Sequence, residues 1–461
     1  MTGVPEPNSQ WLDLVEKALR GKSFEAELVS RTLDGIRIEP LYSPSAGQAI
    51  DRVHMSGWDI RSLVAEADPA AVNRIILDEL SGGAGSITLQ LASPGQFGLP
   101  MRFDAIGRAL KDVRLDIAPV TFLAGDQYFG ALQCLMALWD EQGLEGANRR
   151  ARLDADPLGT LARTGALEQD LWSTLEVLAH FVKQNLDSLG NVSLLLADGR
   201  PYHDAGATEA EEIAMTLATA VEYLRALDYE GVRADRVVPR MGLALGADAD
   251  VLMTIAKFRA MRLVFARMAE TVGAAGPAGS VELAATTSPR MLSRRAPETN
   301  ILRSTLAAAG AIIGGADAIT VLPHTSANAT PDADARRLAR NTSIVLQQEA
   351  NLGRVADPLA GSGAIESLTG ELASKAWSIF QEIEAAGGMA KTLLSGMIGE
   401  RIAAARAWRS AEFANGTRRL IGVSDGPIIA QGALPQPEPI SGDGARITRL
   451  EPVFDEELAK A

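Results

Sequence analysis

Two short segments of the sequence hold residues that could take part in acid–base chemistry. The first, Asp198–Asp204, reads Asp-Gly-Arg-Pro-Tyr-His-Asp, and the second, His324–Asn328, reads His-Thr-Ser-Ala-Asn. An imidazole beside a carboxylate can act as a general acid or base when its pKa lies near neutrality. The alternative, which we favour, is that His203 and His324 satisfy polar groups of the loop backbone. The sequence therefore predicts no catalytic residue.

Metal and phosphate sites are not expected either. The histidines lie far apart, and none stands at a metal-ligand spacing from another histidine or the single cysteine: His54, His180, His203, His324 and Cys134. The glycine-rich stretches 310–315 and 387–389 lack the features of a phosphate loop and are better explained by helix ends or close packing. The loop Asp357–Gly363 could cradle an anion, although a capped tight turn is the favoured explanation. Cofactor-binding residues stay unassigned.

Short apolar runs that alternate with long helical stretches must position these segments. Eight runs have the length and composition of buried strands: Ser86–Leu91, Leu115–Phe122, Ala151–Ala155, Val192–Ala197, Val237–Leu245, Val281–Ala285, Ala318–Leu322 and Arg354–Ala356. Helices long enough to return the chain are expected over Glu209–Leu227, Asp250–Thr271, Thr299–Ile313 and Ala333–Glu349. Eight strand–helix units predict an α/β fold, a TIM (β/α)8 barrel.

Segments of different character flank this barrel. An amphipathic helix over Ser9–Leu19 and an extended stretch, Gly35–Tyr42, indicate an N-terminal arm. A further helix over Ala373–Ala386 precedes a tail rich in proline and glycine, which we expect to be extended. We therefore divide the chain into an arm and lead-in (residues 1–80), a barrel (81–390), and a C-terminal helix with its extended tail (391–461).

Composition excludes several classes of partner. The 461 residues are 47% hydrophobic, which suffices for a large core, and carry a formal net charge of -14, which would repel nucleic acid. The single cysteine precludes an intrachain disulfide, and the first residues do not resemble a signal peptide. Without an apolar run long enough to span a bilayer, no membrane role is expected. We expect a cytoplasmic protein.

Several phrases of the sequence resemble one family of enzymes in the same order and spacing. The strongest is Arg340–Glu349, which reads Arg-Asn-Thr-Ser-Ile-Val-Leu-Gln-Gln-Glu, followed by Arg354–Pro358 and a Gly-Ser-Gly. Others are Lys375–Trp377, Glu384–Ala390 and Leu420–Val423. Together they resemble the acyl-CoA mutases that use adenosylcobalamin, and in particular the methylmalonyl-CoA mutases, over roughly residues 10 to 425.

The departures from that family's pattern concern its reacting residues. Where catalytic mutases carry Gly-Tyr-His after the fourth predicted strand, this sequence has Gly199 followed by Arg200 and Pro201. On the sixth predicted strand the family's Arg-Thr-His-Ser-Gln becomes Glu282–Thr286, so an acidic acyl-CoA would meet Glu282 instead of a guanidinium. The phrase with a substrate-contacting Tyr is reduced to the segment from His54 to Leu63, without Tyr.

The resemblance then implies a small, non-catalytic (beta) subunit of a heterodimeric methylmalonyl-CoA mutase. The family's Asp-x-His-x-x-Gly motif, whose His ligates cobalt, does not occur in these residues, so we expect no cobalamin-binding domain here. Adenosylcobalamin would then be carried by the partner, a full-length cobalamin-binding mutase chain, and this chain alone would bind no cofactor. The N-terminal arm would wrap that partner.

Two alternatives stay open. The barrel could rearrange another acyl-CoA together with a separate small cobalamin-binding chain. It could instead be an acyl-CoA-binding regulatory protein that keeps only the channel for the pantetheine arm. Small Ala, Ser and Thr residues on the predicted inward faces do not decide whether that channel is open.

Overall fold

The structure is a computed structural model that describes residues 9–47, 49–50, 57–93, 96–274, 281–328, 330–424 and 445–459. The polar leader, the segment around His54 and much of the Pro- and Gly-rich tail lie outside these residues. Among the described residues, no helix is long and apolar enough to cross a membrane.

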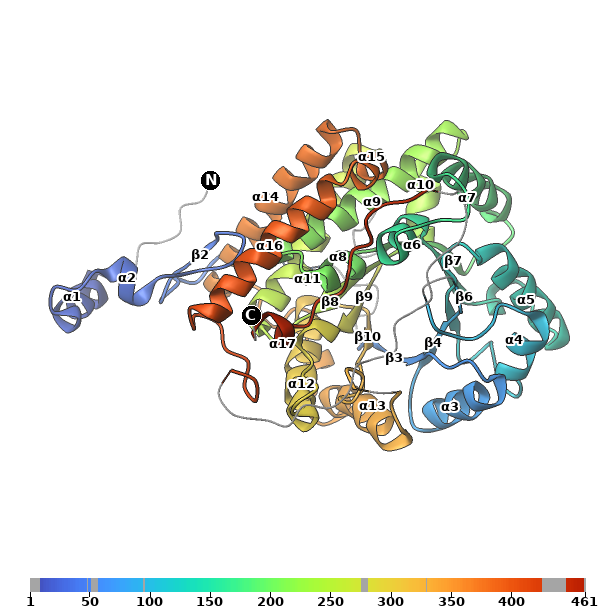
Figure 1. The fold of residues 1–461 in the computed structure, drawn as a ribbon, viewed down its shortest axis with the longest axis horizontal. Coiled ribbons are helices and arrows are strands. Elements are labelled where there is room, and N and C mark those ends of the chain that lie inside the picture. The colour runs from blue at the N-terminus through green and yellow to red at the C-terminus, as the bar shows by residue number, and fades with distance from the viewer. Residues whose placement is uncertain are drawn as a thin grey trace.

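Parallel strands close into a barrel at the centre of the molecule (Figure 1). Their bounds are β3 (Asp59–Val64), β4 (Ser86–Gln90), β5 (Val120–Leu123), β6 (Ala151–Ala155), β7 (Val192–Asp198), β8 (Met241–Ala247), β9 (Glu282–Thr287) and β10 (Ala318–Thr320). They pair in chain order, and β10 closes the ring on β3. Strands with both faces covered read as nearly continuous apolar runs, as Met241–Ala247 does. The predicted TIM barrel is confirmed.

The membership of the barrel differs from the sequence prediction. The predicted eighth strand, Arg354–Ala356, is wrong: Leu352–Arg354 is a 3-10 turn, and Arg354 and Val355 are exposed. The missing strand is β3, at the other end of the chain. It was overlooked because Asp59, Arg61 and Ser62 interrupt its apolar pattern. The barrel therefore begins within residues 1–80, the range expected to hold the arm and lead-in.

Two further strands start later than expected. The chain turns over residues 115–118 before β5, and a short helix, α10 (Ala234–Val237), precedes β8. In each case the residues before the strand include apolar side chains but form a turn or a short helix.

Helices surround the barrel and connect its strands (Figure 1). The helices of the barrel region are α3 (Pro69–Ser81), α4 (Phe103–Ala109), α5 (Tyr128–Glu141), α6 (Pro157–Thr164), α7 (Leu171–Asn185), α8 (Arg200–Ala205), α9 (Glu209–Tyr229), α11 (Val251–Thr271), α12 (Pro297–Gly314), α13 (Ala333–Gln348), α14 (Gly363–Ala385), α15 (Met389–Leu394) and α16 (Met397–Ala414). Polar side chains cap the N-termini of two of the long helices. Thr208 forms a capping box with Glu211 at the start of α9, and Asp250 caps α11.

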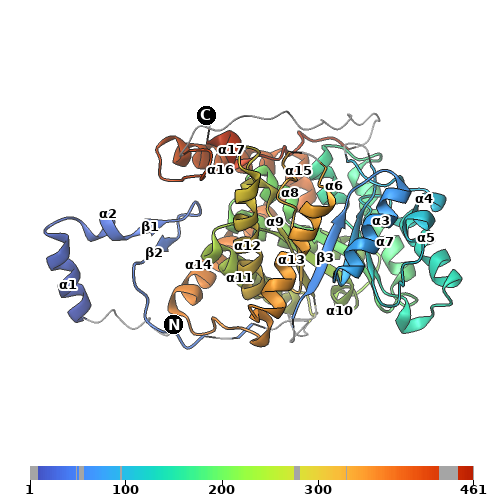
Figure 2. The same ribbon diagram turned by 90° about the horizontal axis from the view of Figure 1, so that it is seen from below.

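The N-terminal arm stands away from the barrel (Figures 1 and 2). It contains α1 (Ser9–Leu19), α2 (Phe24–Leu28) and a two-stranded antiparallel hairpin, β1 (Ser30–Arg31) with β2 (Arg37–Ile38). The hairpin turn reaches back to the barrel region, where Asp34 accepts hydrogen bonds from Thr208 Oγ1 at 2.5 Å and from the amide of Ala210 at 3.3 Å. The predicted arm helix is confirmed.

Residues 445–459, which we call the C-terminal strap, run along the carboxyl end of the barrel. Backbone amides of Ile447 and Val453 donate to the carbonyls of Gly165 and Asp204, at 2.9 Å each. The strap ends in α17 (Asp455–Leu458), which Figure 2 shows beside α16 at one end of the molecule. The strap therefore crosses the loops that follow β6 and β7.

The corrected strand assignment predicts a stability effect. Ile60 on β3 is 7% exposed, whereas Leu14 on the arm helix is 65% exposed. Ile60→Ala should lower the free energy of unfolding in denaturant by about 2–4 kcal/mol, because it removes buried methyl groups and leaves a cavity. Leu14→Ala should change it by less than about 0.5 kcal/mol. Equal small effects would contradict the placement of β3 in the barrel.

Candidate functional site

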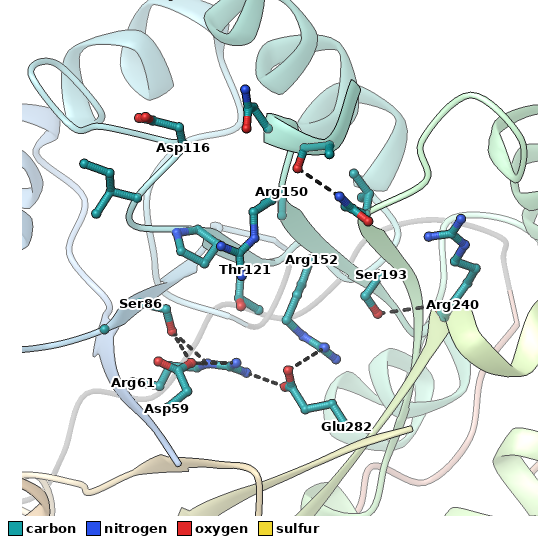
Figure 3. A pocket seen from close by; sticks show the side chains of 18 of the residues that line it. Asp59, Arg61, Ser86, Asp116, Thr121, Arg150, Arg152, Ser193, Arg240 and Glu282 are labelled. Carbon is teal, nitrogen blue, oxygen red and sulfur yellow. Dashed lines mark hydrogen bonds and ion pairs between the residues drawn. The ribbon is translucent and has the colours of Figure 1, made fainter. Parts of the chain in front are cut away.

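The lumen of the barrel is crossed by charged side chains. Arg61 on β3 and Arg152 on β6 both reach Glu282 on β9, with nitrogen–oxygen distances of 3.0 and 3.1 Å (Figure 3). Asp59 accepts from Arg61 at 2.9 Å, and Asp154 lies 3.2 Å from Arg152. We call Arg61, Arg152 and Glu282 the lumen ion-pair layer, because these three side chains join opposite walls of the barrel.

Burial and neighbouring charges act in opposite directions on Arg61 and on Asp154. Burial opposes the charge of the Arg61 guanidinium, but Glu282 and Asp59 outweigh it and raise the pKa of Arg61. Burial also raises the pKa of Asp154, against the opposing pull of Arg152 and Arg61. Gly242 on β8 makes room for the second guanidinium, since a Cβ at that position would collide with Nη2 of Arg152. A buried guanidinium is tolerated only with such close anionic partners.

A second set of ion pairs lies nearer the carboxyl ends of the strands. Arg200 donates two hydrogen bonds to the Asp198 carboxylate, from Nε to Oδ1 at 2.7 Å and from Nη2 to Oδ2 at 2.9 Å. It also donates to Thr286 Oγ1 on β9 at 3.1 Å. Arg163 donates to the same carboxylate at 2.7 Å. Arg200 occupies the position at which catalytic mutases carry a Tyr. Its guanidinium therefore links Asp198 at the end of β7 to Thr286 on β9.

Little space remains between these two sets. A cavity of about 20 Å³ is lined by Arg61, Arg152, Asp154, Arg200 and Thr286, among others. That volume is close to the space a single buried water needs. In this conformation a chain of atoms the width of a pantetheine arm would have to displace the ion pairs to pass along the lumen.

A much larger cavity, of about 960 Å³, opens at the amino ends of the strands (Figure 3). Asp59, Ser86 and Glu282, which begin β3, β4 and β9, line it together with Arg150 and Arg240. The lumen ion-pair layer forms its inner wall, as Figure 3 shows. Reacting groups in TIM-barrel enzymes lie at the opposite, carboxyl end.

At that carboxyl end, His203 is fully buried in a charged network. Its Nδ1 lies 3.0 Å from Glu212, and its Nε2 lies 2.8 Å from Ser288 Oγ. Lys257 donates to the same carboxylate of Glu212 at 2.6 Å. Both ring nitrogens are thus occupied by side chains, neither by Asp204 nor by loop backbone. The prediction that His203 satisfies polar groups of the loop backbone is wrong, because its partners are side chains. The acid–base couple with Asp204 does not form either.

The network fixes protonation states. Burial and Arg290 lower the pKa of His203 to about 4, against Glu212, which raises it. Burial opposes ionisation of Glu212, but Lys257 and His203 lower its pKa to about 2. Burial and Asp198 raise the pKa of Asp204 to about 7. The imidazole is thus enclosed among side chains, with its Nδ1 against the Glu212 carboxylate.

The remaining sequence candidates are structural or isolated. His324 is half-buried beyond β10, and its carbonyl accepts from Asn300 at 2.9 Å. Asp357 caps its turn by accepting from the amide of Leu359 at 3.3 Å, and it also accepts from the amide of Ile50 at 3.1 Å. The favoured capped turn is therefore confirmed. In the described ranges, no group of His, Cys, Asp and Glu side chains could hold a metal ion.

The sequence identified Glu282 as a departure from the pattern of the catalytic mutases, but the lumen ion-pair layer was not predicted. A usable signal was present: charged residues alternate on predicted barrel strands, as in Arg152 and Asp154. Because alternate residues of a strand face the same side, such pairs point together into the lumen or together toward the helices. The missed strand β3 concealed the third member, Arg61.

Comparisons with known proteins agree with this architecture. Residues 47–427 match a family model described as methylmalonyl-CoA mutase. A methylmalonyl-CoA mutase small subunit from Streptomyces virginiae is 40% identical, over 96% of this chain and 74% of the relative. The small subunit from Propionibacterium freudenreichii subsp. shermanii is 33% identical over 91% of this chain and 68% of its own length. A methylmalonyl-CoA mutase from Cereibacter sphaeroides is 28% identical over 91% of this chain and 64% of its own length.

The lumen ion-pair layer predicts a large effect of one charge. Glu282→Gln should lower the free energy of unfolding by about 2–4 kcal/mol, because two buried guanidiniums lose their shared partner. We expect a smaller loss than the largest values for fully buried ion pairs, because the Glu282 side chain is 20% exposed. Asp235→Asn removes the carboxylate of an exposed pair with Arg233 and should leave stability nearly unchanged. Equal effects of the two substitutions in urea unfolding would contradict the layer.

The His203 network predicts a pH dependence of stability. In the unfolded chain this imidazole has its ordinary pKa of 6.5, so unfolding takes up a proton between pH 6.5 and about 4. Its stabilising contribution is complete above pH 6.5 and is lost as the pH falls to about 4. The difference in unfolding free energy between wild type and His203→Gln should therefore shrink on acidification, by at most about 1.4 kcal/mol per pH unit.

The matched control for this titration is His180→Gln, which changes an exposed imidazole. Because this side chain is exposed, its replacement should change the free energy of unfolding by less than about 0.5 kcal/mol. A difference for His203→Gln that stays constant or grows toward pH 4 would contradict the neutral, buried state of this residue.

Proposed function

The chain belongs to the methylmalonyl-CoA mutase family, and from this premise we propose that it is a small subunit that supports a larger mutase chain. The partner would isomerise methylmalonyl-CoA and succinyl-CoA, and this chain would contribute no reacting residue. The observation that carries the proposal is the lumen ion-pair layer of Arg61, Arg152 and Glu282, together with the cavity of only about 20 Å³ above it. A substrate cannot react in a lumen that paired side chains fill.

The substitutions and the geometry support each other. Glu282 replaces a cation in the family's pattern, and in the structure it is the shared anion between two guanidiniums. Arg200 replaces a Tyr and is held by Asp198 and Thr286. Both departures therefore add ion pairs that stabilise the closed barrel. This is the pattern expected of a chain that retains the fold for assembly.

The residues of this chain do not fit adenosylcobalamin at the carboxyl end of the barrel. The C-terminal strap lies along that rim, and the buried carboxylate of Glu456 in the strap accepts from Ser293 Oγ at 2.8 Å and from the amide of Arg294 at 2.7 Å. His203, which follows β7 at this end of the barrel, is fully buried. We therefore propose that the partner chain binds the cofactor of the complex.

The N-terminal arm supports a protein partner. None of residues 10–19 in α1 is buried, and Leu12 and Leu14 are 41% and 65% exposed. An isolated helix of this length is marginal in water and gains stability when its apolar face is covered. We propose that the larger mutase chain covers it. Because the only thiol, Cys134, is buried and unpaired, the chain needs no oxidising compartment, and we place the complex in the cytoplasm.

The experiment that tests this function is affinity purification of the tagged chain from its native cells, followed by native mass spectrometry. We expect a stoichiometric complex with one larger, cobalamin-containing chain. Recovery as a homo-oligomer, or with only a small cobalamin-binding chain, would overturn the proposal and favour a distinct mutase or an acyl-CoA-binding protein.

The arm predicts which substitutions weaken that complex. Leu14→Asp should reduce recovery of the larger chain at least about tenfold, because burying a carboxylate at an apolar contact costs several kcal/mol. Tyr229→Asp, at a side chain 90% exposed at the end of α9, is the control and should leave recovery unchanged. Unchanged recovery with the arm variant would remove the arm from the interface.

A further inference from the structure

A second sizeable cavity lies outside the lumen, where the barrel wall is incomplete. Pairing between β10 and β3 is limited to Ala318 with Asp59 and Ile319 with Ile60, whereas β3 continues to Val64. β10 is short, ending at Thr320. The two strands separate beyond this point, and a cavity of about 320 Å³ occupies the seam between the sheet and helices α3 and α13. We call it the seam pocket.

The walls of the seam pocket are mainly apolar. Ile60 and Val64 of β3 face Ile319 of β10 and Val321 beyond it, and Ile75 of α3 closes one side. Ile75 and Val321 are only partly buried, so the packed layer of side chains is interrupted here. Well-packed interiors rarely leave a space of this size empty, and its volume lies at the lower end of the range of small-molecule sites.

Two guanidiniums one helical turn apart on α13 line the same pocket. Arg340 is committed to Glu79, with Nη1 to Oε1 at 2.9 Å, and Ser62 donates to the same carboxylate at 2.7 Å. Arg336 differs: Nη1 donates to the carbonyl of Pro331, and among the described residues no carboxylate lies within ion-pair distance of it. The half-buried Arg336 is therefore a cation at an apolar cavity without an acidic partner in this part of the chain.

Other charges at the pocket are accounted for. Arg61 reaches its inner edge, but Glu282 and Asp59 hold that guanidinium. Glu66, at the end of β3, also lines the pocket, and its Oε1 accepts from the amide of Ala67 at 2.7 Å. A ligand therefore meets an apolar wall and one guanidinium with free N–H groups. A ligand with a second negative charge would be repelled by Glu66.

We propose that the seam pocket binds a medium-chain monocarboxylic acid. The aliphatic chain would cover Ile60, Val64 and Ile319, and Arg336 would bind the carboxylate. A guanidinium offers two parallel N–H groups that match the two oxygens of a carboxylate, and burial of methylene groups adds favourable free energy for each. The site is separate from the lumen and does not depend on the partner chain.

Isothermal titration calorimetry of the full chain with sodium octanoate tests the proposal directly. We expect one saturable site, with octan-1-ol binding at least about tenfold more weakly because it lacks the charge that Arg336 pairs. Butyrate should also bind more weakly, since its shorter chain covers less of the apolar wall. Absence of saturable octanoate binding, or equal binding of octanoate and octan-1-ol, would overturn the proposal.

Variants locate the site. Arg336→Gln should weaken octanoate binding at least about tenfold, whereas Arg337→Gln, on the same helix but paired with Asp334 outside the pocket, should bind as wild type does. Ala339→Phe should block binding by filling the cavity, with circular dichroism to confirm its fold. Octanoate binding to Arg336→Gln as tight as to wild type would contradict the assignment even if Ala339→Phe failed to fold.

Discussion

Charge inside a barrel must be paired, and that requirement organises this molecule. Arg61, Glu282 and Arg152 come from three separate strands and meet in the lumen, where a lost partner would leave a largely buried charge unpaired. Each member holds its own strand in register with the others, and Asp59 and Asp154 complete the set. The same contacts that stabilise the barrel close the route along which a reaction would have to occur. The narrow lumen and the stability of the barrel thus have one physical cause.

The carboxyl end of the barrel repeats this principle. His203, Glu212 and Lys257 are wholly buried, and Arg290 joins Asp248 at 2.6 Å beside them. The C-terminal strap adds Asp455 and Glu456 to the same region. Groups that could serve as acids, bases or anion ligands in an open site are here committed to one another. The family framework is kept, and its polar residues serve packing.

Sequence patterns predicted the regular elements well where local signals exist. The long helices α9, α11 and α13 were predicted to within two residues, and in the structure Thr208, Asp250 and Asp332 cap them. The strand β3 was missed because the residues that form the lumen ion-pair layer make it look polar. The partners of His203 were unpredictable, since Glu212 and Ser288 lie 9 and 85 residues away along the chain and only the closed barrel brings Ser288 to the imidazole. Long-range ion pairs depend on topology, which a local pattern does not specify.

We propose that the lumen of this chain holds no substrate and that the larger mutase chain binds it. The most direct measurement is the stoichiometry of methylmalonyl-CoA binding to the purified complex of the two chains, by equilibrium dialysis. The lumen ion-pair layer predicts one bound ester per pair of chains, with none retained by this chain alone. Two esters per pair, or saturable binding to the isolated chain, would contradict it.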